Sequence, residues 1–115
     1  MSLGPEVLAV RSTPSGITIE IVLRSEHRLL QGHFPAVAIF PGVGQIHWAI
    51  EAARQHLDMR ESHVSLHQLK FTRLIRPQVP VQLDLHRAPT SNLVFFRLLQ
   101  SERDCASGQI RFANA

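Results

Sequence analysis

The segment from Pro41 to Leu57 reads PGVGQIHWAIEAARQHL. Its apolar residues recur at spacings of three and four, the period of one helix face. We predict a helix that begins at Pro41-Gly42 and ends near Leu57 or Asp58. The face is formed by Val43, Ile46, Ile50, Ala53 and Leu57, and Trp48, Ala49 and Ala52 extend it around the other side. Because apolar residues surround much of this helix, we expect other parts of the chain to wrap around it.

Segments on both sides of this helix alternate between apolar and polar residues, the period of strands. Before it, residues 17–23 alternate, and the turn residues 13–16 predict a pairing strand over 7–11. After it, two opposite phases between 64 and 75 predict a bulge near His67-Gln68. Further strands are expected over 79–85, over 93–99 and around 110–112, with a turn at 101–104. Two strands, one long helix and a meander of three or four strands make an α+β layer architecture.

The composition indicates a single compact domain over residues 1–115. Hydrophobic residues make up 44% and charged residues 18%, which suits a buried core rather than a disordered chain. The net charge is +3, but the basic residues are scattered. Tyr is absent and Trp48 is the only Trp, so no base-stacking platform and no nucleic-acid partner are expected. A diffusely basic surface favours an acidic partner.

Cys105 is the only cysteine, which excludes an intrachain disulfide and a cysteine-based metal site. No run of 18 apolar residues occurs, so we expect no membrane span. The first residues resemble no secretory leader, and a cytoplasmic location is therefore expected.

The start of the helix is the first candidate site. Pro41-Gly42 provides no Ser, Thr, Asp or Asn as N-cap, so the first backbone N–H groups lack an evident side-chain partner. Gly42 and Gly44 allow another molecule to approach the backbone closely. Free N–H groups at the positive end of a helix suit a carbonyl oxygen or a developing oxyanion. Water or a neighbouring loop capping this end is an equally good interpretation.

Two histidines flank the helix start. His33 lies in the loop before Phe34-Pro35, where a neutral imidazole would be a suitable general base; the alternative is a surface or structural histidine. His47 falls on the predicted apolar face, where it needs a partner, and Glu51 one turn further on is a candidate. His47 is then either a second acid/base group or a buried histidine satisfied by hydrogen bonds. Two histidines without a third ligand do not make a metal site, and none is expected.

These residues also resemble a known family. Gly32-His33-Phe34-Pro35, followed by Phe40-Pro41-Gly42-Val43, is similar to the signature of the 3-hydroxyacyl-[acyl-carrier-protein] dehydratases. Residues 70–77 are similar to the second motif of that family. Gln45-Ile46-His47-Trp48 further resembles the dehydratase-like members of aryl polyene biosynthesis clusters. The resemblance spans roughly residues 17–85.

The resemblance implies a hotdog fold, in which an antiparallel sheet of five or six strands wraps one long central helix, and a homodimer with two sites at its interface. It implies that His33 removes the α-proton of a 3-hydroxyacyl thioester and that the backbone at Gly42 and Val43 binds the thioester carbonyl. The product would be a trans-2-enoyl thioester of fatty acid or polyene biosynthesis. The implied partner is acidic acyl-carrier protein with a phosphopantetheine-linked chain, contacted by Arg73 and Arg76. No cofactor is implied.

The chain departs from the family pattern at an important position. Fourteen residues after the loop histidine, the family has an Asp or Glu that reaches the partner subunit's site and protonates the departing hydroxyl; here that residue is His47. Two further functions therefore stay open. One is a non-catalytic subunit that binds acyl chains or acyl-carrier protein, with a partner supplying the acid. The other is a hotdog thioesterase that uses Glu51, the only carboxylate on the helix.

Overall fold

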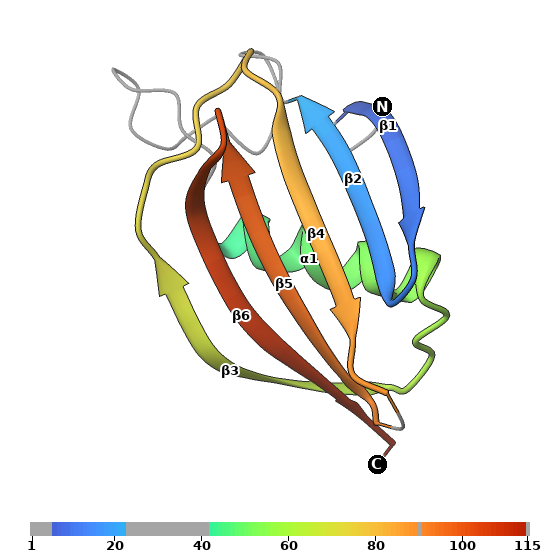
Figure 1. Cartoon of the computed structure of the whole chain (residues 1–115). Coiled ribbons are helices and arrows are strands. Elements are labelled where there is room, and N and C mark those ends of the chain that lie inside the picture. The colour runs from blue at the N-terminus through green and yellow to red at the C-terminus, as the bar shows by residue number, and fades with distance from the viewer. Residues whose placement is uncertain (1–5, 23–41, 90, 115) are drawn as a thin grey trace.

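The computed structural model describes residues 6–22, 42–89 and 91–114, which form a single helix lying across one face of a six-stranded antiparallel sheet (Figure 1). The helix α1 spans Gly42–His56, so it starts and ends where the sequence predicted. The strands are β1 (Glu6–Thr13), β2 (Gly16–Val22), β3 (His63–Phe71), β4 (Val81–Arg87), β5 (Leu93–Gln100) and β6 (Arg103–Ala113). This is the predicted α+β hotdog architecture.

The strand order is β1-β2-β4-β5-β6-β3, and each neighbouring pair is antiparallel. Short turns join β4 to β5 and β5 to β6, so these strands pair in sequence. Residues 72–80 join β3 to β4 and are too many for a tight hairpin. β3 instead pairs with β6 at the far edge of the sheet. The prediction of a simple meander after the helix is therefore wrong at β3.

β3 contains the predicted bulge. Its register with β6 shifts between His67 and Lys70, and Gln68 has a φ of 56°, in the left-handed region. The strand ends at Phe71, so its predicted continuation through Ile75 is wrong. The reason is a change of direction in the chain: the amides of Thr72 and Arg73 both donate to the carbonyl of Cys105. Ile75 is completely buried, but in the connecting segment.

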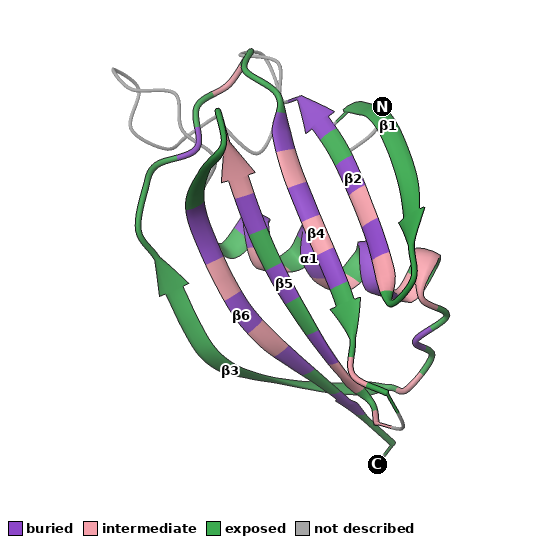
Figure 2. Cartoon of the chain, in the orientation of Figure 1, coloured by how far each residue is buried: buried purple, intermediate pink, exposed green. Residues whose placement is uncertain are grey.

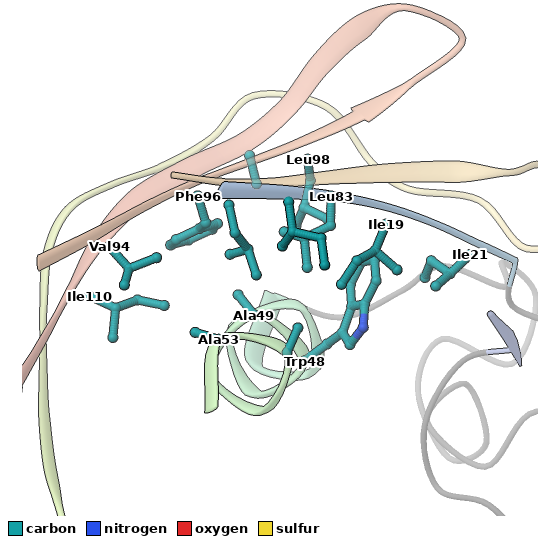
Figure 3. Close-up of a cluster of buried hydrophobic side chains, with 14 of the residues drawn as sticks. Ile19, Ile21, Trp48, Ala49, Ala53, Leu83, Val94, Phe96, Leu98 and Ile110 are labelled. Carbon is teal, nitrogen blue, oxygen red and sulfur yellow. The ribbon is translucent and has the colours of Figure 1, made fainter. Parts of the chain in front are cut away.

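The helix packs on the sheet through small residues and one large one. Ala49 and Ala53 are fully buried, and Trp48 beside them lies against the apolar side chains of β2 and the central strands (Figure 3). A side chain of one carbon lets the helix backbone approach the sheet closely, so these alanines mark tight packing rather than open space. The opposite wall of the core comes from alternate residues of the strands, among them Ile19, Leu83, Phe96, Leu98 and Ile110.

The helix is rotated relative to the predicted apolar face. Its buried residues are Gly44, Gln45, Trp48, Ala49, Ala52 and Ala53. Val43 is 81% exposed, whereas Ile46 and Ile50 are half-buried. The predicted face is therefore wrong at Val43, whereas Ala53 is fully buried and Ile50 and Leu57 pack against the core.

The two edges of the sheet are open. Every residue of β1 and of β3 is exposed in the single chain (Figure 2). On β3 the exposed side chains include Val64, Leu66, Leu69 and Phe71. An uncovered edge with apolar side chains provides unpaired backbone groups and apolar surface to another strand.

Candidate functional site

The first turn of α1 is partly open to solvent. Gly42 is half-buried and begins the helix, and the next residue, Val43, is largely exposed. The first turn contains no acidic side chain that would complement its N–H groups. Both residues that were predicted to bind a carbonyl oxygen therefore lie where a ligand can reach the helix end.

Phe71 is the neighbour of Gly42 that the sequence did not indicate. A Cβ atom added to Gly42 would lie 3.3 Å from Cε1 and 3.4 Å from Cζ of Phe71. The ring at the end of β3 therefore lies against the start of the helix, and 49% of Phe71 remains exposed. Phe71 is the last residue of β3 and pairs with Ala106 of β6, so it reaches the helix start only through the tertiary fold, which the spacing of residues in the sequence does not reveal.

His47 and Glu51 both lie on the exposed side of α1. The expectation that His47 is buried on the apolar face is wrong, because the helix turns that position away from the sheet. No hydrogen bond or ion pair joins His47 to Glu51, although both are among the described residues, so the expected pairing of the two side chains is also wrong. Both groups are free to meet a second molecule on this side of the helix.

His33 lies outside the described residues, as do the rest of the loop motif and Pro41. In the sequence, His33 comes nine residues before Gly42. Its role as a base stays a prediction.

The segment 72–80 between β3 and β4 carries Arg73 and Arg76, and its backbone is fixed. Thr72 Oγ1 donates to the carbonyls of Asp104 and Cys105 at 3.1 and 3.3 Å. Gln100 holds the other half: its Oε1 accepts from the Arg76 amide at 3.1 Å, and its Nε2 donates to the Arg76 carbonyl at 2.9 Å. Gln100 Nε2 also donates to the Val79 carbonyl at 3.0 Å.

This anchoring leaves the two arginines on the surface. Arg73 and Arg76 are exposed, and so is Leu74 between them, whereas Ile75 is buried and holds the segment to the core. Because Phe71 touches Gly42 and Arg73 follows two residues later, the basic segment starts beside the helix end. Nothing in the sequence indicates that Gln100, at the end of β5, holds the backbone of this segment.

Cys105 is buried and carries no site. Burial raises the pKa of its thiol, which keeps it protonated and unreactive at neutral pH.

Within residues 6–22, 42–89 and 91–114, no three His, Cys, Asp or Glu side chains gather as metal ligands. In that same part of the chain, no helix has the length and hydropathy needed to cross a membrane.

Comparison with known families gives one match that covers most of the chain. A family model described as ApeI-like, ApeI dehydratase, matches residues 9–109. The match includes the loop motif, the whole helix and all but the ends of the sheet. No curated protein matches the sequence.

Solved structures share the fold at low sequence identity. The dehydratase heterocomplex ApeI:P from Xenorhabdus doucetiae contains a chain with a TM-score of 0.88 and 23% identity, covering 96% of this chain and 98% of that one. An uncharacterized protein from Erwinia carotovora subsp. atroseptica has a TM-score of 0.83 and 23% identity, covering 96% of each chain. The dehydratase domain from the CurF module of curacin polyketide synthase has a TM-score of 0.73 and 18% identity, covering 98% of this chain and 44% of that one.

Proposed function

This chain belongs to the ApeI-like dehydratase family, and we propose that it removes water from a 3-hydroxyacyl thioester carried by acyl-carrier protein. The observation that carries the proposal is the accessible amide end of α1, where half-buried Gly42 lies against the ring of Phe71 and Val43 is exposed. The thioester carbonyl binds there, and the N–H groups stabilise the negative charge that its oxygen gains as the α-proton leaves.

In the proposed reaction, His33 takes the proton from C2 of the substrate. The electron pair of that C–H bond forms the C2–C3 double bond, and the C3 hydroxyl leaves with a proton as water. His47 is proposed as the proton donor, since an imidazolium can donate near neutral pH. Its exposure on the far side of its own helix suits a residue that acts in a site shared with a second subunit.

The open edge at β3 is the proposed place for that second subunit. Antiparallel pairing of two β3 strands would satisfy their unpaired backbone groups and cover Val64 and Leu66. Phe71 connects this edge to the helix start, so a partner on β3 lies close to the site. We propose a homodimer through this edge.

A second candidate is a subunit that binds the acyl chain while a different chain supplies the acid. It is favoured by one specific observation: an imidazole, not a carboxylate, occupies position 47. A chain of the same fold is part of the dehydratase heterocomplex ApeI:P. In this case the β3 edge pairs with the other chain, and the protein alone does not turn over substrate.

The test is dehydration of a 3-hydroxyacyl-carrier protein, followed as enoyl product by mass spectrometry from pH 5.5 to 9. We expect turnover by the wild type and a loss of about 10²–10⁴-fold in His33→Ala, the range for removal of a general base. The absence of turnover at every pH, with acyl-carrier protein still bound, would favour the binding subunit. Release of free thiol that disappears in Glu51→Ala would identify a thioesterase instead.

The proposed dimer is tested by placing a charged residue on each of the two edge strands of the sheet in turn. Leu66→Lys on β3 is expected to shift the protein to a monomer, because it places a charge at the paired edge. Val10→Lys on β1 is the matched control and should leave the dimer intact, since Val10 is likewise an exposed apolar residue on an edge strand. Light scattering after size exclusion measures both, with circular dichroism as the check of folding.

A further inference from the structure

The sheet face that points away from α1 has a hollow of about 500 Å³. It lies over β4, β5, β6 and the bulged part of β3. Leu83 and Leu85 of β4 are buried against the helix, so the residues between and after them, Asp84 and His86, belong to the opposite face. This face is turned toward the viewer in Figure 2, with α1 behind the sheet. The hollow is thus separate from the proposed acyl site.

Two cross-strand rows line the hollow. The strand registers place His86, Phe95, Gln109 and His67 side by side in one row, and Asp84, Arg97, Ser107 and Lys70 in the next. On β4, β5 and β6 the two rows are two residues apart, so there they lie about 7 Å from one another. On β3 they are three residues apart, because the bulge lies between His67 and Lys70. One row presents aromatic rings, and the other presents charge.

The charged row can hold an anion between two cations. Ser107 pairs with Arg97 on one side and with Lys70 on the other. Its short side chain leaves room between the two long ones and provides a hydroxyl donor. Lys70 is exposed and makes no salt bridge with any described residue. An anion above Ser107 would therefore meet two cations and one hydroxyl.

Asp84 is the acidic group in this row, and its carboxylate is already satisfied. Its Oδ1 accepts from Thr18 Oγ1 at 3.0 Å and from Gln82 Nε2 at 2.8 Å. Its Oδ2 faces Arg97 Nη2 at 3.4 Å, on the side of Arg97 away from Ser107. Arg97 Nε also lies 3.7 Å from Asp104, a loose contact of two exposed side chains. Such contacts are weak enough for Arg97 to accept a further anion.

The other row offers an aromatic surface. The rings of His86 and Phe95 are 6.1 Å apart and tilted by 51°, and Phe95 is 38% exposed. His86 is fixed by Ser15, whose Oγ lies 2.7 Å from Nδ1. A flat ring placed here covers apolar surface that is otherwise in water, with ring contacts of the kind that stabilise aromatic pairs.

We propose that this hollow binds a small aromatic carboxylate. The ring of the ligand lies on Phe95 and His86, and its carboxylate lies on Ser107 between Lys70 and Arg97. The spacing of the rows requires an arm of two or three atoms between ring and carboxylate, as in a phenylpropanoate. The site is independent of the proposed dehydration and of its residues.

The experiment is a titration of the full ¹⁵N-labelled chain with 3-phenylpropanoate, followed by NMR. Saturable shifts at residues 68–70, 95–97 and 107–109 are expected. The neutral amide, 3-phenylpropanamide, should bind at least about tenfold more weakly, because it cannot use the two cations. Butyrate, which keeps the carboxylate but lacks the ring, should bind at least about tenfold more weakly as well.

Variants separate the site from unspecific attraction to a basic protein. Lys70→Gln should weaken phenylpropanoate binding about five- to tenfold, whereas Arg11→Gln, which removes a cation of β1 beyond the hollow, should leave it unchanged. Shifts spread over the whole surface, equal binding of acid and amide, or equal effects of the two variants would each overturn the proposal. Unchanged spectra at millimolar ligand would overturn it too.

Discussion

The two sides of α1 differ in the residues they carry and in their exposure to solvent. The side against the sheet is built from Gly44, Trp48 and alanines, and it is sealed. The other side carries Val43, His47 and Glu51, all exposed in the single chain. An aliphatic residue in solvent beside alanines in the core reverses the usual preference. Shape therefore determines the residues of the first side, which must fit under the sheet, whereas the second side is accessible to a ligand or a partner.

The largest effect on stability is expected on the sealed side. Ala49→Leu inserts three carbons where the side chain has no exposed surface, so overpacking should cost about 2 kcal/mol and lower the Tm by roughly 8 °C. Val43→Leu adds one carbon on the open side and should change stability by less than about 0.5 kcal/mol. Thermal denaturation measures both. Equal losses in the two variants would remove the distinction between the sides.

The open side should respond in activity instead. His47→Gln is expected to lower the dehydration rate about 10²-fold if the imidazole donates the proton. Its Tm should stay within about 2 °C of the wild type, because the side chain is exposed and no salt bridge to a described residue is lost. Single-turnover kinetics measure the dehydration rate of the variant, and melting curves measure its Tm. A full rate in the variant would assign proton donation to another group.

The smallest effect is expected far from either side, at the β5–β6 turn. Ser101 and Glu102 have φ values of 52° and 65°, a conformation that non-glycine residues adopt at a cost. Replacing them with Asn-Gly should raise the free energy of unfolding by about 0.5–1 kcal/mol and leave the dehydration rate unchanged. Urea denaturation measures the gain. A loss of stability would show that these side chains make contacts that offset the backbone strain.

Much of the fold could be predicted because the local spacing of apolar residues agrees with the tertiary structure. The limits of the helix and the β1–β2 hairpin follow from the period at which apolar residues recur. The bulge near His67 follows from a change in the phase of their alternation. The place of β3 could not be predicted, since strand order depends on which edge a nine-residue connection reaches. The sequence does not predict the exposure of Val43, because hydrophobicity alone does not include the shape of the sheet that covers the helix.

For the candidate site, the motif indicated the helix start but not its neighbours. Gly42 was identified from the missing N-cap, a local signal. Phe71 and Gln100 were missed because their roles arise from strand register and from a side chain that binds a distant backbone segment. Polar contacts between residues that are far apart in the sequence leave no repeating pattern by which the sequence could predict them.

The backbone N–H of Gly42 is the group on which the proposed chemistry depends most directly. Gly42→Pro removes that hydrogen while keeping a residue that suits the first position of a helix. Gly42→Ala is the matched control, because it keeps the N–H and introduces the same Cβ toward Phe71. We expect Gly42→Ala to retain the dehydration rate within about threefold and Gly42→Pro to lose about 10²–10³-fold. Equal rates for the two folded variants would contradict carbonyl binding at this end of the helix.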